Sequence, residues 1–487
     1  MRIAIVGSGF AGIGMGIKLR QAGMKDFVIL ERAGDLGGTW RDNSYPGCQC
    51  DIPSRLYSFS FALEPHWSRT FPTQPEILDY LHRVAAERGI DRHVRYNHEV
   101  LEASWDDARH SWRIETTQGP IEAQVLVSAV GGLSEPSIPT LPGIEAFTGT
   151  SFHSAQWNHD HDLSGRRVAV IGTGASAIQF VPRIQPLVDK LHVYQRTPPW
   201  VMPHPDRPVK EWERRLYETV PLAQRLVRAG IYWGRETYAI GFVVDQRMLQ
   251  LAERVARRHL RDQVVDPELR QKLTPRYAMG CKRILISNDY FPALKKPNVE
   301  LVTSGIDEVR AQSIVTADGV ERQIDTIIYG TGFQAADMPV SRRVRGRDGV
   351  TLHDVWNEGG AQAYKGTTVA GFPNLFLVVG PNVGLGHSSM VFMIESQVAY
   401  ILDCLRTMQR DAVATVEVRA DAQDEYNADL RRRLGGTVWA TGCRSWYLDS
   451  EGRNVALWPG FTYPFRLMTR RFDAARYLLR RVPAEAV

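Results

Sequence analysis

Two glycine-rich segments have the composition and spacing of phosphate-binding loops. The first, GSGFAG at residues 7–12, follows the apolar run 3–6, and the second, GTGASA at residues 172–177, follows the apolar run 168–171. In such patterns the first glycine permits a tight turn, the second lets the backbone approach a pyrophosphate, and the last residue, glycine or alanine, lets a helix pack closely. The N-terminus of that helix presents free N–H groups to the phosphates. We therefore expect two dinucleotide sites, with contacts from Gly7, Gly9 and Gly12 at one and from Gly172, Gly174, Ala175 and Ser176 at the other.

The residues after the next strand at each site distinguish the two cofactors. Glu31 follows the run 27–30, where an acidic side chain accepts hydrogen bonds from ribose hydroxyls and repels a 2′-phosphate. At the second site Arg196 and Thr197 follow the run 191–194, and an arginine there can bind a 2′-phosphate with its fork of donors. The sequence therefore predicts NADPH at the second site and a cofactor without that phosphate at the first.

Two further motifs resemble the fingerprints of flavin-dependent Baeyer–Villiger monooxygenases. Residues 37–51, GGTWRDNSYPGCQCD, match the pattern (A/G)GxWxxxx(F/Y)P(G/M)xxxD at every specified position, and residues 147–157 match FxGxxxHxxxW. That family inserts one atom of O2 next to a ketone carbonyl. The related flavin monooxygenases that oxidise nitrogen or sulfur share the second motif except for its tryptophan, which is Trp157 here. Asn158 departs from the proline or aspartate that the family places next.

The resemblance implies roles for residues of both motifs and of the segment 280–283, GCKR. FAD would occupy the first site and NADPH the second. Arg283 would be the catalytic arginine, stabilising a deprotonated flavin C4a-peroxide and the negative adduct that forms when it attacks the carbonyl. Asp51 would orient that guanidinium through a charge-assisted pair, and Lys282 would add a contact to the phosphate of NADPH. The resemblance also implies cofactor contacts from Gly38, Thr39, Trp40, Tyr57 and Asn382, and a functional role for His153.

Several of these side chains also have a simple structural explanation. Asp51 could cap the turn at residues 52–54, because aspartate favours such positions. His153 could be a buried histidine with satisfied hydrogen bonds, and Arg283 could belong to a surface ion pair. A non-catalytic cofactor-binding sensor would keep both glycine patterns but would need neither Asp51 nor Arg283. A simple NADPH oxidase or reductase is a further alternative, because an uncoupled monooxygenase behaves in that way.

The 487 residues are enough for more than one domain. We expect an α/β fold with two Rossmann-like dinucleotide-binding domains. The FAD-binding domain would comprise residues 1–145 and, with a C-terminal lid, residues 326–487, and the NADPH-binding domain would comprise residues 146–325. Residues 210–273 combine helical spacing with many arginines, which predicts a helical insertion in the NADPH domain. Charged residues interrupt its apolar part, 222–244, so a place in the core or in a channel wall is favoured over a membrane surface.

Composition argues against several other classes of protein. A hydrophobic content of 44% and a charged content of 23% are typical of soluble globular proteins, and the net charge is only +5. Arginine runs such as 431–433 are typical of solvated helices rather than of a nucleic-acid site. No long apolar run indicates a membrane span and no signal-peptide pattern opens the chain, so a cytoplasmic protein is expected. The five cysteines are expected to be reduced, with Cys48 and Cys50 packed in the interior and no metal site.

Together, the motifs predict an FAD- and NADPH-dependent monooxygenase. It would use O2 to convert a ketone or an aldehyde to an ester or lactone. The alternative with the same fold is a flavin monooxygenase that oxidises the nitrogen or sulfur of a small molecule. The patterns select neither an individual substrate nor an oligomeric state.

Overall fold

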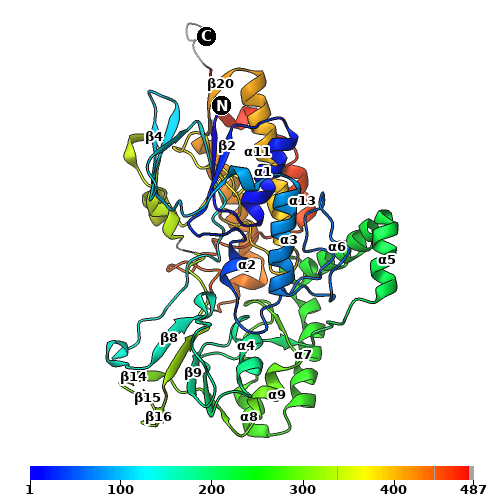
Figure 1. The fold of residues 1–487 in the computed structure, drawn as a ribbon, viewed down its shortest axis with the longest axis vertical. Helices are drawn as coiled ribbons and strands as arrows, with labels where there is room; N and C mark the ends of the chain where they lie inside the picture. The colour runs from blue at the N-terminus through cyan, green and yellow to red at the C-terminus, as the bar shows by residue number, and fades with distance from the viewer. Residues whose placement is uncertain (337, 444, 482–487) are drawn as a thin grey trace.

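The computed structural model describes residues 1–336, 338–443 and 445–481. Two parallel five-stranded sheets form its two halves, which are stacked along the long axis of the molecule (Figure 1). The strand order is β19-β7-β1-β2-β3 in the first half and β13-β10-β9-β17-β8 in the second. The predicted α/β fold with two Rossmann-like units is therefore confirmed. The strands are β1 (Ile3–Val6), β2 (Phe27–Leu30), β3 (Val94–Arg95), β7 (Val125–Ser128) and β19 (Leu375–Leu377), then β8 (Thr150–His153), β9 (Arg167–Ile171), β10 (Lys190–Tyr194), β13 (Val299–Val302) and β17 (Thr326–Tyr329).

The first strand-to-helix turn depends on glycine at both of its ends. After β1 the backbone of Gly7 has a φ of +101°, a left-handed conformation that favours glycine. The helix α1 (Phe10–Gln21) then passes so close that a Cβ atom on Gly12 would lie 1.9 Å from the carbonyl oxygen of Gly7. The glycine pattern thus lets α1 pack directly on β1 and places its N-terminus beside the turn.

Helices and smaller sheets cover the two parallel sheets. The helix α3 (Gln74–Glu87) begins with a capping box between Thr73 and Glu76, and α11 (Met390–Arg410) packs along α1. The further helices are α2 (Thr39–Asp42), α4 (Ala177–Ile184), α9 (Tyr290–Leu294), α10 (Leu352–Gly359), α12 (Ala420–Gly435) and α13 (Thr462–Met468). The further strands are β4 (Val100–Asp106), β5 (Ser111–Thr116), β6 (Ile121–Ala123), β14 (Ile306–Arg310), β15 (Ser313–Thr316), β16 (Glu321–Gln323), β18 (Val344–Arg345), β20 (Val413–Val418) and β21 (Tyr477–Arg481).

The segment that joins the two halves forms an edge strand of the second sheet. This strand, β8, pairs in parallel with β17, and Tyr329 lies opposite His153. Because β17 also pairs with β9, residues 326–329 belong to the second sheet. The boundary expected at residue 325 therefore falls just before β17, and the chain returns to the first half only after this strand. A strand followed by glycine occurs in both halves, so the pattern alone could not assign β17 to one of them.

A group of helices lies between β11 (Val201–Met202) and β12 (Leu285–Ile286), where the sequence predicts a helical insertion. In Figure 1, α5 and α6 extend away from the two sheets. The outward side of α6 carries leucine and tryptophan side chains that are exposed, so the core, one of the two expected places, is wrong for this part of the helix. Among the described residues, no helix is both long enough and apolar enough to cross a bilayer. The helices are α5 (Glu211–Thr219), α6 (Pro221–Val243), α7 (Leu249–Gln263) and α8 (Pro267–Lys272).

Two of the five cysteines form a disulfide, contrary to the expectation of reduced thiols throughout. Cys281 is bonded to Cys443, which lies 162 residues further along the chain. The sequence could not indicate this pair, because the two residues meet only when the C-terminal segment folds back toward the insertion. Cys48 and Cys50 are free and buried, as expected. Burial raises the pKa of the Cys48 thiol to about 12.

Candidate active site

Asp51 and Arg283 form a bidentate ion pair between the two halves of the molecule. Arg283 Nε donates to Asp51 Oδ2 and Nη2 donates to Asp51 Oδ1, each at 2.7 Å. Arg283 Nη1 also donates to the backbone oxygen of Leu385 at 3.3 Å, which fixes the plane of the guanidinium. Asp51 follows α2 in the first half, whereas Arg283 lies just before β12 in the second. About a quarter of each side chain is exposed, so this pair is not the surface ion pair considered from the sequence.

The attraction between Asp51 and Arg283 outweighs the free-energy cost of burying their two charges. Burial alone would raise the pKa of the Asp51 carboxyl, but the guanidinium of Arg283 holds that pKa below its ordinary value. Burial alone would lower the pKa of Arg283, but the carboxylate of Asp51 raises it above the ordinary value. Both groups are therefore charged at neutral pH.

A second arginine, Arg235, lies near this pair. It belongs to α6, and its Nε is buried with no hydrogen-bond partner in the described part of the chain. Burial lowers the pKa of Arg235, while the charge of Asp51 raises it and that of Arg283 lowers it. The ring of Tyr238 lies 5.3 Å from the guanidinium carbon. Two guanidinium groups and one carboxylate thus act on one another, so the three side chains together carry a net positive charge.

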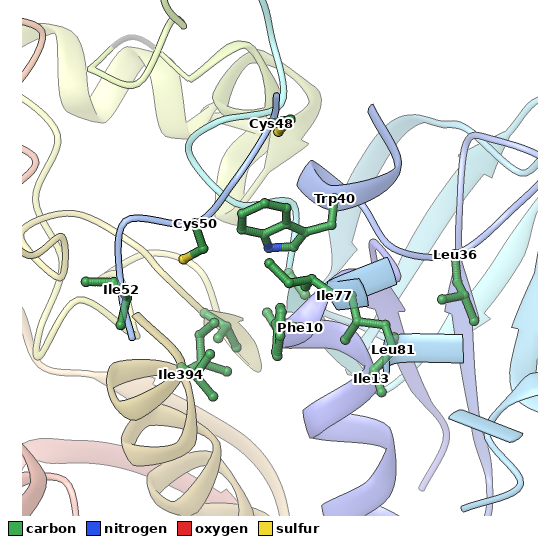
Figure 2. Packing of buried hydrophobic residues seen from close by; sticks show 14 of the residues in the cluster. Phe10, Ile13, Leu36, Trp40, Cys48, Cys50, Ile52, Ile77, Leu81 and Ile394 are labelled. Atoms are coloured by element: carbon green, nitrogen blue, oxygen red, sulfur yellow. The ribbon is translucent and has the colours of Figure 1, made fainter. Parts of the chain in front are cut away.

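The loop formed by the first of the two fingerprint motifs, residues 37–51, brings aromatic side chains and glycine backbone to the first nucleotide site. Trp40 Nε1 donates to the hydroxyl of Tyr57 at 3.0 Å, and Tyr57 in turn packs edge-on against Phe10. Figure 2 shows Trp40 between Cys48 and Cys50 on one side and Phe10 on the other. A Cβ atom on Gly38 would lie 3.2 Å from the Cα atom of Gly9, so the two glycine motifs touch through their backbones. Thr39 is exposed at the start of α2.

The same loop is held against the second half by Gln179 of α4. The hydroxyl of Tyr45 donates to Gln179 Oε1 at 2.9 Å, and Gln179 Nε2 donates to the backbone oxygen of Gln49 at 2.9 Å. The ring of Tyr45 also packs edge-on against Phe180 of α4. The loop that ends at Asp51 therefore contacts both halves along its length.

Glu31 is buried at the end of β2 and already accepts several hydrogen bonds from the protein. Its Oε2 accepts from the backbone nitrogen and the hydroxyl of Ser8, and its Oε1 accepts from the backbone nitrogen of Ala33 and from Arg41. Burial would raise the pKa of Glu31, but these donors lower it, so the group is charged. The carboxylate thus holds the first glycine turn in place, and its contact with a ribose stays a prediction.

At the second nucleotide site the structure gathers exposed backbone and two cations. Gly174 and Ala175 are exposed where the turn after β9 leads into α4, and Ser176 is partly exposed. Lys282 is half-buried, and burial and the charge of Arg196 both lower the pKa of Lys282. No carboxylate within the described residues forms an ion pair with either cation. Two like charges without a counter-charge favour an anionic ligand. The backbone oxygen of Thr197 accepts from Thr173 Oγ1 at 3.4 Å.

Comparisons with known proteins identify the enzyme family to which the chain belongs. A family model described as pyridine nucleotide-disulphide oxidoreductase matches residues 4–221. A Baeyer-Villiger monooxygenase of Pseudomonas aeruginosa is 51% identical over 490 residues, which cover 100% of this chain and 93% of that relative. The chain belongs to the Baeyer–Villiger monooxygenases.

Solved structures extend the likeness over both halves of this monooxygenase. Cyclohexanone monooxygenase from Rhodococcus sp. Phi1 bound to NADP+ is 29% identical with a TM-score of 0.87, and the match covers 99% of each chain. A complex of OTEMO with FAD and NADP is 27% identical with a TM-score of 0.87, and the match covers 98% of this chain and 99% of that one. The likeness therefore extends beyond residue 221, where the match to the family model ends.

Two predicted site residues of this Baeyer–Villiger monooxygenase do not contact the ion pair. His153 is buried in the second half, where its Nδ1 accepts from the backbone nitrogen of Ala155 at 3.1 Å and its ring lies near Phe333. Burial lowers the pKa of His153, so its imidazole is neutral at pH 7. Asn382 Nδ2 donates to the backbone oxygens of Asn454 and Leu457, which ties down the C-terminal segment. Their roles in catalysis and cofactor binding stay predictions.

Sequence reasoning missed two side chains that belong with the pair in this monooxygenase. Arg235 gave no signal, because arginines are frequent throughout the insertion and its neighbours in space come from distant segments. Tyr447 is buried near Arg283, and burial raises the pKa of its hydroxyl to about 12 although the charge of Arg283 opposes this. The segment of Tyr447 follows Cys443 closely, and the disulfide between Cys443 and Cys281 connects this C-terminal segment to the site. Without that disulfide, nothing in the sequence indicates that Tyr447 lies near Arg283.

Proposed function

We propose that Asp51, Arg235 and Arg283 form the oxygenation centre of this Baeyer–Villiger monooxygenase, which uses FAD and NADPH to oxidise ketones or aldehydes. The observation that carries this proposal is the bidentate pair between the two halves, with a second guanidinium nearby whose Nε has no hydrogen-bond partner among the described residues. An enzyme that oxidises a carbonyl must stabilise negative charge on oxygen, and a net positive group of fixed geometry does so.

The residues of the first site fit FAD. The contact between the backbones of Gly9 and Gly38 leaves no side chain in the way of a pyrophosphate. Trp40 and Tyr57 present aromatic surface next to this contact, at the side from which the loop leads to Asp51. When bound and reduced, FAD would activate O2, one atom of which is inserted next to the carbonyl.

The residues of the second site fit NADPH rather than NADH. Arg196 and Lys282 are two cations without an ion-pair partner among the described residues, and a 2′-phosphate would supply the missing negative charge. Lys282 precedes Arg283 directly in the chain. The nucleotide site and the oxygenation centre therefore share one short segment, which would hold the nicotinamide nucleotide close to the catalytic guanidinium.

The pair has a defined task in the reaction. Asp51 holds two nitrogen atoms of Arg283, so the guanidinium cannot rotate away when the substrate binds. A fixed donor already directed at the developing charge needs no reorganisation, and losing one such donor typically costs about 100- to 1,000-fold in rate. Arg235 keeps the site positive although Asp51 neutralises one charge. Oxygen transfer to sulfur or nitrogen needs no such group, because it forms no negative adduct.

The test uses the FAD-loaded enzyme with NADPH, 18O2 and either a cyclic ketone or a thioether. We expect one 18O atom in the ring of the lactone, and a loss of lactone of at least about 100-fold in Arg283→Met. Arg345→Met is the matched control, because Arg345 forms a comparable ion pair with Glu102 at the surface. Lactone formation by Arg283→Met at the wild-type rate, or oxidation of the thioether alone by the wild type, would refute the proposal.

A further inference from the structure

The outward side of α6 is apolar where a solvated helix should be polar. Leu222, Leu226 and Trp233 are 62%, 65% and 55% exposed. Their spacing places all three within a sector of about 40° around the helix axis, at about 100° per residue. Ala229 and Gly230 between them are exposed as well and add no charge. Apolar residues on the solvent side of a helix gain nothing in the folded monomer, so this stripe needs another explanation.

The stripe continues onto α13, which lies beside α6. The rings of Trp233 and Tyr463 are 5.9 Å apart, and the hydroxyls of Tyr232 and Thr462 are hydrogen-bonded at 3.0 Å. Tyr463 and Leu467 of α13 are exposed. We refer to Leu222, Leu226, Trp233, Tyr463 and Leu467 as the α6–α13 face. Two elements that are far apart in the sequence thus present one apolar surface.

Exposed cations border this face. Arg225 is exposed on α6, beside the stripe. On the other side, Arg466 of α13 lies over the ring of Phe392. Burial and the positive charges of Arg88 and Arg466 lower the pKa of Lys18, so these cations also belong to this border. Arg470 and Arg471 are exposed directly after α13. The border is therefore rich in positive charge.

Three carboxylates near the face have partners within the described part of the protein. Glu236 is buried, where it accepts from the backbone nitrogen and hydroxyl of Thr462 and pairs with His387. Glu395 accepts from the backbone nitrogen of Ser60, and Glu218 at the end of α5 pairs with His66. An anionic partner would therefore meet cations at the border and apolar side chains in the middle.

We propose that the α6–α13 face docks this monooxygenase on the surface of an anionic lipid bilayer. Leucine and tryptophan side chains would enter the boundary between headgroups and acyl chains, and the arginines of the border would contact lipid phosphates. A second copy of the chain fits less well, because a twofold contact through this face would bring the arginines of both copies together. The proposal concerns binding at the surface, since no described helix can span a bilayer.

The test is flotation of the FAD-loaded full-length chain with large unilamellar vesicles. We expect binding to vesicles of phosphatidylcholine with about one-third phosphatidylglycerol, at least about tenfold weaker binding to phosphatidylcholine alone, and release at high salt. The variant Leu222→Ser/Leu226→Ser should bind the anionic vesicles about 30-fold more weakly, because two exposed leucines no longer enter the lipid. The variant Arg225→Gln/Arg470→Gln should also bind about 30-fold more weakly, from about 1 kcal/mol per arginine near an anionic surface.

The matched control is Ile138→Ser/Leu187→Ser, which removes two similarly exposed apolar side chains outside the α6–α13 face. This control should bind as the wild type does. Equal binding to both kinds of vesicle, or equal losses in the leucine variant and the control, would overturn the proposal. Light scattering without vesicles measures the oligomeric state of the chain. A dimer that Leu222→Ser/Leu226→Ser converts to a monomer would show that a second copy covers the face, and would equally overturn the proposal.

Discussion

Replacing Lys282 with methionine should weaken binding of NADP+ without a comparable effect on NAD+. Methionine keeps most of the aliphatic length of lysine and removes only the charge. A hydrogen bond to a charged group contributes about 1.5–3 kcal/mol, which corresponds to a loss of about 10- to 150-fold in affinity. Lys282 is half-buried and Arg196 is exposed, so the loss in Lys282→Met should exceed the loss in Arg196→Met.

The pH dependence of binding gives a second signature of the same contact. The second pKa of a phosphate monoester is about 6, so affinity for NADP+ should rise as the pH rises through that value. Burial and Arg196 lower the pKa of Lys282, so the lysine loses its proton at a lower pH than an ordinary lysine. Affinity should therefore fall again on the alkaline side, and Lys282→Met should lack this fall.

Isothermal titration of the oxidised, FAD-loaded enzyme with NADP+ and with NAD+ measures these affinities without turnover. Lys296→Met is the control, because Lys296 is an exposed cation in the same half. The reasoning is refuted if Lys282→Met loses affinity for both nucleotides equally, since the lysine would then act on the shared part of the cofactor or on the fold. Unchanged affinity for NADP+ would refute it as well.

Three further outcomes can be checked by simple measurements. Asp51→Asn should lower stability by about 2 kcal/mol at pH 7 in thermal unfolding, because Arg283 loses its hydrogen bonds to a charged group. The pKa of Asp51 is lowered in the native state, so its contribution to stability is fully present above the unfolded pKa of about 4 and is lost as the pH falls through the native pKa. An equal difference in stability between Asp51→Asn and the wild type at pH 3 would contradict this. Thiol titration of the denatured, oxidised chain should find three thiols and, after reduction, five; five before reduction would contradict the disulfide between Cys281 and Cys443. Gly12→Ala should lose FAD and cost at least about 3 kcal/mol, because its Cβ would overlap a carbonyl oxygen, and full retention of FAD would argue against the tight turn.

Local pattern was enough to predict the two nucleotide-binding turns. At Gly7 and Gly12 the strand, the turn and the helix follow one another within a few residues, so the physical constraint is visible in the sequence. The partnership of Asp51 and Arg283 is different, because 232 residues separate them. Only resemblance to a family suggested it, and no periodicity or spacing could have done so.

What the sequence could not predict depends on contacts between distant segments. From the sequence, Arg235 was only one of the charged residues that interrupt the apolar part of the insertion, and its position near Asp51 on α6 gives it a role. The apolar part of the insertion was expected in the core or in a channel wall, because apolar residues at helical spacing are normally buried. Leu226 is exposed instead, and a pattern cannot reveal which side of a helix lacks a partner.

The ion pair between Asp51 and Arg283 has a consequence for how the enzyme matures. Each half contains a complete glycine turn, so each could bind its nucleotide once its own sheet has folded. The oxygenation centre exists only after both halves have docked, because each half supplies one member of the pair. The first half itself is finished last, because its strand β19 comes from residues 375–377, after the whole of the second half. The enzyme can therefore direct oxygen toward a carbonyl only after the last stage of folding, when the ion pair has formed.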